Sequence, residues 1–343
     1  PLRYYLRYGV DLKEREEFTF SPVNFGVVLH AVIREVCDEI KKNGESYYLI
    51  SEEKRREMVK RSVSAITDIY QNSILKDSSR NSFMIKRMED LADRTIWAMG
   101  EQLKCGDFVP FVFEHKFNME VGDGDRKQLM SGTIDRVDIC ENDTDVYVRI
   151  IDYKTGKKDF NIVKTYYGID IQLMVYMEAA MKLVAKMRPG KNVVPAGVFY
   201  YNISDPIVSA TNESAEEIED KIKGELRLKG MVNSDKDIAE KMDNTGGTSL
   251  NIPVSRKADG GFDSRRSKVM NTEQFNMLGR FVDVRAVDTA DRIAGGDIRR
   301  SPYKDGQFSS CDRCPYGAVC GFSVDLPGCN YRKLKKFDDE VLW

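Results

Sequence analysis

Long hydrophobic runs are absent from this sequence of 343 residues, although 41% of its residues are hydrophobic and 31% are charged. Its longest apolar stretches fall far short of the ~18 residues that a transmembrane helix needs, and no charged-then-apolar signal segment opens the chain. We therefore expect a soluble globular protein without membrane contacts. The length predicts either two units or one large α/β domain with insertions.

Net charge is almost absent as well. The 53 Lys and Arg residues stand against 55 Asp and Glu residues, which gives a formal charge of -2 at pH 7. This balance excludes a protein whose whole surface attracts polyanions. Any contact with nucleic acid must therefore use a local groove.

Cysteine is scarce and unevenly placed. An odd total of seven argues against a secreted disulfide framework and favours a reducing, cytoplasmic setting. Cys37, Cys105 and Cys140 are scattered through periodic segments that are typical of a core. Cys311, Cys314 and Cys320 instead share one turn-rich segment, and grouped thiolates suit Zn²⁺ or an iron–sulfur centre, both of which want four ligands. Cys329 is a conceivable fourth ligand, but its Pro-Gly-Cys-Asn context favours a plain turn.

Hydrophobic periodicity predicts mostly helix in the first hundred residues and a mixed sheet after them. The expected helices cover residues 22–43, 51–73, 82–104, 168–187, 214–228 and 272–294, and the expected strands cover residues 108–117, 128–140, 145–156 and 193–204. Three antiparallel strands, a crossover helix and a further strand give an α/β fold with helices against the sheet.

Four parts of the chain follow from this pattern. We expect a helical part over residues 1–105, an α/β core over 106–204, an insertion or surface loop over 205–270, and a helix with the cysteine cluster over 271–343. The third part is predicted to be a loop because it is rich in Gly, Ser, Asn and Asp.

The sharpest chemical signal joins two of the expected strands. Asp152 and Lys154 are two residues apart on one strand and therefore share a face, and Asp135 on the preceding strand can reach the same edge. Carboxylates in such a group suit Mg²⁺ or Mn²⁺, and a lysine can orient an attacking water. The alternative is a surface ion pair, but Asp152 ends an apolar run in which an unpaired carboxylate would be costly. Gln172 and Tyr176 share one face of the next helix.

These residues resemble the RecB-type branch of the PD-(D/E)XK nucleases, whose fold is a restriction-endonuclease-like mixed sheet flanked by helices. The segment Gly26-Val-Val-Leu-His30 matches the upstream helix that supplies a histidine in that branch. The resemblance implies a metal held by His30, Asp135, Asp152 and the backbone carbonyl of Tyr153, with Lys154 as the catalytic lysine. It implies supporting roles for Gln172 and Tyr176, and an indirect one for Glu114 behind the ligands. His115 is interpreted as structural.

The cysteines resemble those of AddB-type subunits of bacterial AddAB helicase-nucleases, in which three such cysteines and one distant upstream cysteine hold a 4Fe-4S cluster. The upstream motif is similar to residues 1–9, which begin Pro1-Leu-Arg-Tyr4-Tyr5. The resemblance therefore implies that the fourth ligand precedes Pro1, that the chain is a piece of a longer protein, and that a cluster here is incomplete or lost. Zinc is the alternative occupant.

The function implied by the resemblance is exonuclease cleavage of single-stranded DNA that an AddA-type helicase-nuclease partner produces from a duplex end, in recombinational repair of double-strand breaks in the bacterial cytoplasm. Arg136, Lys157 and Lys158 flank the proposed ligands and are candidates for DNA contact. Other basic groups, such as Arg299 with Arg300, are interpreted as solvated surface. The alternative function is a non-catalytic module that docks on DNA ends and carries a vestigial site.

Overall fold

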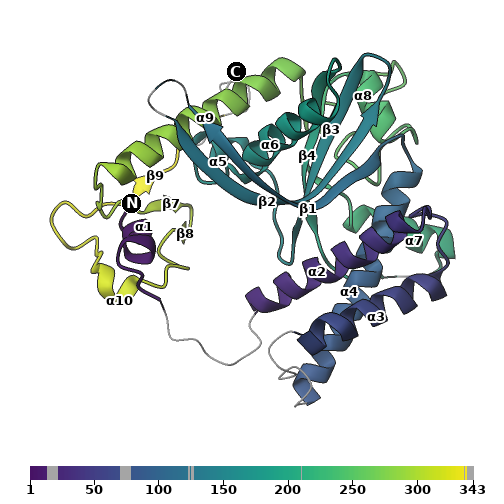
Figure 1. Ribbon diagram of the computed structural model, residues 1–343, viewed down its shortest axis with the longest axis horizontal. Coiled ribbons are helices and arrows are strands. Elements are labelled where there is room, and N and C mark those ends of the chain that lie inside the picture. The colour runs from purple at the N-terminus through teal and green to yellow at the C-terminus, as the bar shows by residue number, and fades with distance from the viewer. Residues whose placement is uncertain are drawn as a thin grey trace.

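The computed structural model describes residues 1–13, 22–69, 79–122, 124, 127–209, 211–335 and 337. A six-stranded sheet with the order β1-β2-β3-β4-β5-β6 forms its centre (Figure 1). The strands are β1 (Val109–Val121), β2 (Gln128–Glu141), β3 (Asp145–Lys154), β4 (Asn192–Asn202), β5 (Lys229–Asn233) and β6 (Val269–Met270). Strands β1 to β3 are antiparallel neighbours and β4 runs parallel to β3, which confirms the expected mixed sheet.

Helices cover both faces of this sheet. They are α2 (Pro22–Lys42), α3 (Glu52–Ile69), α4 (Ser79–Lys104), α5 (Ile162–Tyr166), α6 (Gln172–Met187), α7 (Ala215–Glu225), α8 (Lys236–Met242) and α9 (Thr272–Ala294). Figure 1 shows α2, α3 and α4 together on one side and α6 and α9 on the other. None of the described helices is long and apolar enough to cross a membrane.

Two hydrophobic cores result, one on each side of the sheet. Strand alternation divides the residues of β3, because Ile151 enters the core under α2, α3 and α4 while Ile150 enters the core under α6 and α9. On α2, Leu29, Val32, Ile33 and Val36 recur at helical spacing and are all buried. Burial of each such side chain contributes about 1.5–3 kcal/mol, so these contacts fix α2 against the sheet.

The segment 205–270 corrects the sequence prediction. Apart from a helix over residues 214–228, which α7 matches, we expected an insertion or surface loop there, but the segment also supplies the two last strands of the sheet, β5 and β6, and the helix α8. Leu228 and Val232 are fully buried in the core under α4. The carboxylate of Asp243 accepts hydrogen bonds from Ser249 and Asn251, which fold the connecting residues into a compact layer. The buried Ser249 hydroxyl in turn accepts hydrogen bonds from the backbone N–H groups of Asn251 and Ile252.

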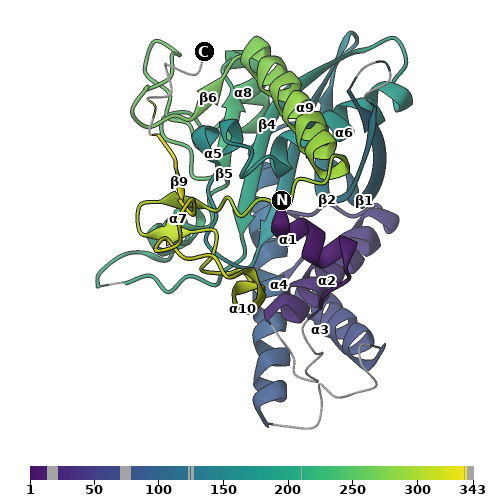
Figure 2. The same cartoon turned by 90° about the vertical axis from the view of Figure 1, so that its left-hand side faces the viewer.

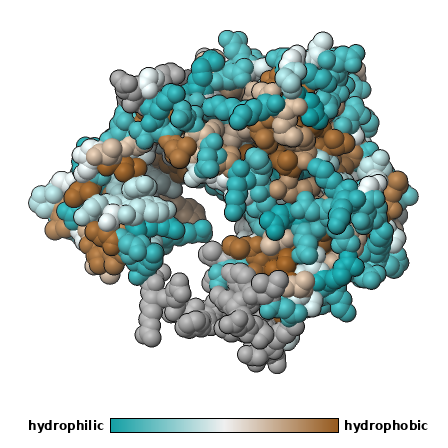
Figure 3. Space-filling model, in the orientation of Figure 1, coloured by the Kyte–Doolittle hydropathy of each residue, from teal (hydrophilic) through white to brown (hydrophobic). Residues whose placement is uncertain are grey.

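The two ends of the chain form a small module of their own. It holds α1 (Leu2–Tyr4), η1 (Tyr5–Gly9), α10 (Gly317–Cys320) and a second sheet of β7 (Tyr303–Asp305), β8 (Phe308–Ser309) and β9 (Arg332–Lys333). The hydroxyl of Tyr316 donates to the carbonyl of Leu12 at 3.0 Å, and Figure 2 shows α1 beside the cysteine-bearing segment. The space-filling view shows a hollow between this terminal module and the rest of the chain (Figure 3).

Candidate active site

Three side chains from three different elements meet at one end of the sheet. His30 Nδ1 of α2 lies 3.3 Å from Glu114 Oε1 of β1 and 3.5 Å from Asp135 Oδ1 of β2. Among the described residues, these three form the one group of His, Cys, Asp or Glu side chains whose ligand atoms all lie within 4.8 Å of one another. Their geometry therefore suits a single metal ion.

The backbone explains why these side chains converge. His30 follows the buried Leu29 on α2, so it sits at the border of the face that packs on the sheet. Glu114 has a φ of 45°, a left-handed conformation that a non-glycine residue rarely adopts. It falls between the paired positions Phe113–Arg136 and His115–Ile134, beside Asp135 on the neighbouring strand. Strained backbone of this kind is concentrated at functional sites, where it aims a side chain.

Asp152 and Lys154 adjoin this group, as the two-residue spacing predicts. Asp152 is 1% exposed and forms an ion pair with the Lys154 ammonium. The second oxygen of Asp135 accepts a hydrogen bond of 2.7 Å from the backbone N–H of Tyr153, which fixes Asp135 between β2 and β3. The structure thus places His30, Glu114, Asp135, Asp152 and Lys154 in one site.

The charges in this site perturb one another strongly. Burial and the neighbouring Asp135 carboxylate raise the pKa of Asp152 to about 6, and the Lys154 ammonium opposes the rise. Burial disfavours the imidazolium of His30, but hydrogen bonds to Asp135 and Glu114 outweigh burial and raise the His30 pKa to about 10. Asp135 and Glu114, which favour a proton on His30, and the neighbouring Asp152 make this crowded acidic group a natural place for a divalent cation.

Gln172 and Tyr176 lie over the same site from the first turns of α6. Gln172 Nε2 donates to the Tyr176 hydroxyl at 2.9 Å. Burial raises the pKa of the Tyr176 phenol, and the carboxylates of Asp152, Asp135 and Glu114 raise it further. The ring packs edge-on against Phe117, so the hydroxyl is held close to the acidic group.

Arg136 does not face DNA, and its predicted role is wrong. It is 1% exposed, and its guanidinium donates to Asp138 at 2.7 and 2.6 Å. Arg149 donates to the same carboxylate at 2.9 Å. Successive residues of a strand point to opposite faces, so Asp135 reaches the site while Arg136 enters the core under α2. The triad of Arg136, Asp138 and Arg149 is a buried structural ion cluster.

Lys157 and Lys158 follow β3 and have different surroundings. Lys157 is exposed, whereas the Lys158 ammonium lies 3.0 Å from Asp170 Oδ2 and 5.2 Å from the centre of the Tyr200 ring. Tyr200 donates to Asp170 at 2.7 Å, and the same ring lies 5.6 Å from the Lys154 ammonium. Both lysines line a groove of about 840 Å³ beside the site, together with Arg87 and Lys229.

Cys311, Cys314 and Cys320 surround a cavity of about 220 Å³ in the terminal module. Pro1 lines this cavity too. The three cysteines are not among the described groups whose ligand atoms all lie within 4.8 Å of one another. Cys329 is buried and lines a different pocket.

Sequence reasoning missed two features of the site. Glu114 was expected behind the ligands, but it contacts His30 directly, from a left-handed backbone position that the sequence pattern does not reveal. Asp170 and Tyr200 were not expected at all, although they lie beneath Lys158 and beside Lys154. The sequence offered two signals for them: Asp170 is a carboxylate just before α6, and Tyr200 is a polar aromatic residue within the buried strand β4.

Comparison with known proteins agrees with this geometry. The sequence profile of the PD-(D/E)XK nuclease superfamily matches residues 1–321. Over its whole length the chain is 34% identical to an ATP-dependent helicase/deoxyribonuclease subunit of Clostridium acetobutylicum, 34% identical to that of Caldanaerobacter subterraneus subsp. tengcongensis, and 32% identical to that of a Thermoanaerobacter species. The chain spans 30% of the length of each of these relatives. With a match across this much of its sequence, the chain belongs to the PD-(D/E)XK nuclease superfamily.

Proposed function

We propose that this chain is a metal-dependent deoxyribonuclease domain that acts as an exonuclease on single-stranded DNA. The observation that carries the proposal is the convergence of His30, Glu114 and Asp135 beside the ion pair of Asp152 and Lys154. A metal-dependent nuclease places a cation at the scissile phosphate, and a nearby lysine can offset charge there; this site offers ligands for the cation and an ammonium for the second role.

Oxygen and imidazole ligands of this kind fit Mg²⁺ or Mn²⁺. His30, Asp135, Asp152 and the backbone carbonyl of Tyr153 would hold the ion, with Glu114 as a further ligand. The bound ion would supply an activated water and polarise the phosphodiester. Lys154, held by Asp152, would orient the attacking water and offset charge on the phosphate. Gln172 and Tyr176 would keep the strand or the water in place above the ligands.

The names of the relatives support the wider setting of this proposal. In it, an AddA-type helicase-nuclease partner unwinds a duplex end and feeds one strand to this domain during break repair in the bacterial cytoplasm. Lys157 and Lys158 in the groove beside the site would meet that strand. The cysteines would contribute to a 4Fe-4S cluster, because three thiolates around one cavity suit an iron–sulfur centre.

The nuclease proposal is tested by degradation of end-labelled single-stranded DNA in Mg²⁺ and in Mn²⁺. Asp152→Asn and Lys154→Ala should lower the rate by at least about 100-fold. The exposed residues Asp143 and Lys186 supply matched controls, and Asp143→Asn and Lys186→Ala should cut at the parent rate. Equal inertness of the parent and all variants with both metals would show that the site is vestigial and would favour the docking module.

The cysteine proposal has a separate test. Iron, sulfide and zinc content should be measured in anaerobically purified parent protein and in Cys314→Ser. Iron and sulfide that disappear in the variant support the cluster, and stoichiometric zinc in the parent would overturn it.

A further inference from the structure

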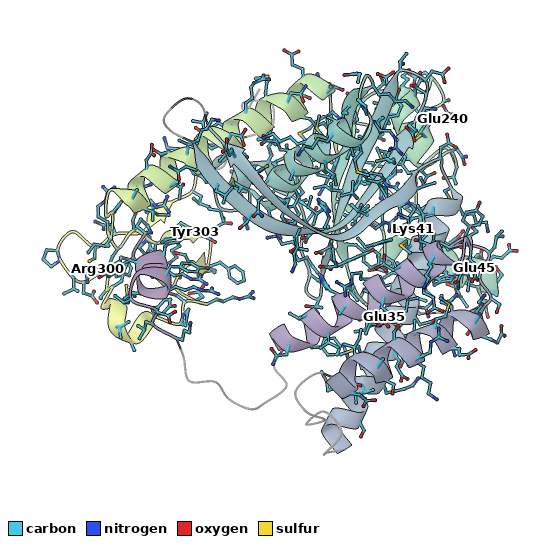
Figure 4. All side chains as sticks on the ribbon, viewed as in Figure 1. Glu35, Lys41, Glu45, Glu240, Arg300 and Tyr303 are labelled. Atoms are coloured by element: carbon cyan, nitrogen blue, oxygen red, sulfur yellow. The ribbon has the colours of Figure 1, made fainter. Side chains whose placement is uncertain are left out.

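An arginine pocket lies in the terminal module, outside the candidate active site. Its walls carry Arg292 from the last turn of α9, Arg299 and Arg300 from the segment after it, and Arg332 from β9, and its volume is about 740 Å³. Figure 4 labels Arg300 and Tyr303 in this module. The hollow seen in Figure 3 separates the module from the side of the molecule that carries α2, α3 and α4. None of the lining residues belongs to the metal cluster.

The arginine pocket has a surplus of positive charge. None of the residues that line it is acidic. Asp297, which lies outside the lining and is largely buried, accepts ion pairs from Arg292 at 2.8 Å and from Arg299 at 2.7 Å. Asp297 thus forms ion pairs with two of the four arginines, whereas the printed hydrogen bonds of Arg300 and Arg332 go to backbone carbonyls, although the net charge of the whole chain is slightly negative. This concentration of positive charge is local to the pocket and could not be predicted from the composition of the whole chain.

Backbone contacts hold the other two arginines in place. Arg300 donates to the carbonyls of Cys320 at 3.3 Å and Gly321 at 3.1 Å. Arg332 donates through Nε to the carbonyl of Ser301 at 3.1 Å. A guanidinium has five N–H donors, so these bonds orient each side chain and leave donors for a ligand. Fixed donors with surplus charge are pre-organised to bind an anion.

The ligand chemistry follows from the number and spread of the donors. One small anion needs one or two guanidinium groups, whereas four around an open pocket of this size match successive phosphates of a strand. We propose that the arginine pocket binds the phosphodiester backbone of DNA at a place apart from the residues that cut it. This inference rests on the proposed function, because it gives the same substrate a second point of attachment.

The test is equilibrium binding of fluorescein-labelled DNA in EDTA over a series of salt concentrations. One arm uses a mixed-sequence single strand and the other a blunt duplex, which distinguishes the two sources of backbone phosphate. Arg292→Gln combined with Arg332→Gln should weaken binding about tenfold and reduce the salt slope by about 1.4 for the single strand, since each lost contact accounts for about 0.7. A loss of affinity and of salt slope for either the single strand or the duplex supports the proposal and identifies the form of DNA that the pocket binds.

Two further variants make the result specific. Arg265 and Arg280 are exposed outside the pocket, so Arg265→Gln combined with Arg280→Gln is the matched control and should bind like the parent. Arg292→Lys combined with Arg332→Lys keeps the charge and should retain most of the salt slope, which covers the case in which the glutamine variant unfolds. An unchanged slope in the glutamine variant, or an equal loss in the control, overturns the proposal. EDTA prevents cleavage, so an inert nuclease site would leave this outcome unaffected.

Discussion

Asp135 accepts a hydrogen bond of 2.7 Å from the backbone N–H of Tyr153, on the strand next to its own. Its other carboxylate oxygen lies 3.5 Å from the His30 imidazole. One side chain thus ties β2 to β3 and orients the histidine that arrives from α2. Because this hydrogen bond leaves Asp135 little freedom to turn, the ligand group is set by the sheet itself and not by a flexible loop.

Glu114→Gln should weaken Mn²⁺ binding at least about tenfold, because Glu114 contacts His30 within the ligand group. The variant removes one of several crowded negative charges, so the unfolding midpoint of the metal-free protein should stay the same or rise. Isothermal titration calorimetry measures the affinity. Glu120→Gln, at an exposed position of the same strand, is the control. Parent-like affinity in Glu114→Gln would return Glu114 to an indirect role.

Asp138→Asn should destabilise the fold by about 3–5 kcal/mol, because it leaves the buried guanidiniums of Arg136 and Arg149 without a carboxylate. Urea unfolding at neutral pH, with Asp143→Asn as the exposed control, measures the loss. A loss below about 1 kcal/mol would mean that the cluster is not held together by charge.

The same residue predicts how stability depends on pH. Burial opposes ionisation of Asp138, but Arg136 and Arg149 outweigh burial and lower its pKa below the usual value. A carboxyl whose folded pKa is depressed stabilises the fold above its unfolded pKa of about 3.9, and this stability disappears as pH falls through the folded pKa. The parent should therefore lose stability on acidification below about pH 4 more steeply than Asp138→Asn does.

Strand alternation explains both what the sequence predicted in this site and what it did not. Asp152 and Lys154 were found because a two-residue spacing on a strand places side chains on one face. Arg136 was assigned to DNA because it adjoins Asp135 in the sequence, although alternation sends it to the opposite, buried face. The available signal was Asp138, a second carboxylate on that same face two residues later.

Other features depend on contacts between residues far apart in the chain. His30 could be assigned only through a family resemblance, because nothing in a helical pattern tells a ligand from a buried polar residue. Strand β6 has two residues and β5 has five, and such short strands between polar turns have no periodicity to detect. Their place in the sheet is set by the pairing of β5 with β4 and of β6 with β5, and by the buried Val232.

Tyr176→Phe should lower the cleavage rate about tenfold while leaving the unfolding midpoint unchanged, because it removes the hydroxyl that Gln172 holds near the carboxylates. The ring remains to pack against Phe117. Single-turnover cleavage with saturating enzyme separates this effect from DNA affinity. Tyr48→Phe, at an exposed position away from the site, serves as the comparison. A rate equal to that of the parent would show that the hydroxyl only fills space.

Lys157 and Lys158 are neighbours in the sequence, but they have different surroundings, so we expect their alanine variants to have different effects on DNA binding and on stability. Lys157 is exposed in the groove beside the site, so Lys157→Ala should reduce the salt slope of single-strand binding by about 0.7 without changing stability. The Lys158 ammonium is 3.0 Å from Asp170 and lies over Tyr200, so part of its charge is already compensated. Lys158→Ala should therefore reduce the salt slope less than Lys157→Ala does. It should also lower the unfolding midpoint, because the buried Asp170 carboxylate loses its ion pair and, among the described side chains, keeps the Tyr200 hydroxyl as its partner. Anisotropy titrations in EDTA and thermal unfolding of both variants measure these quantities, and the reverse order of slopes would place the strand against Lys158 instead.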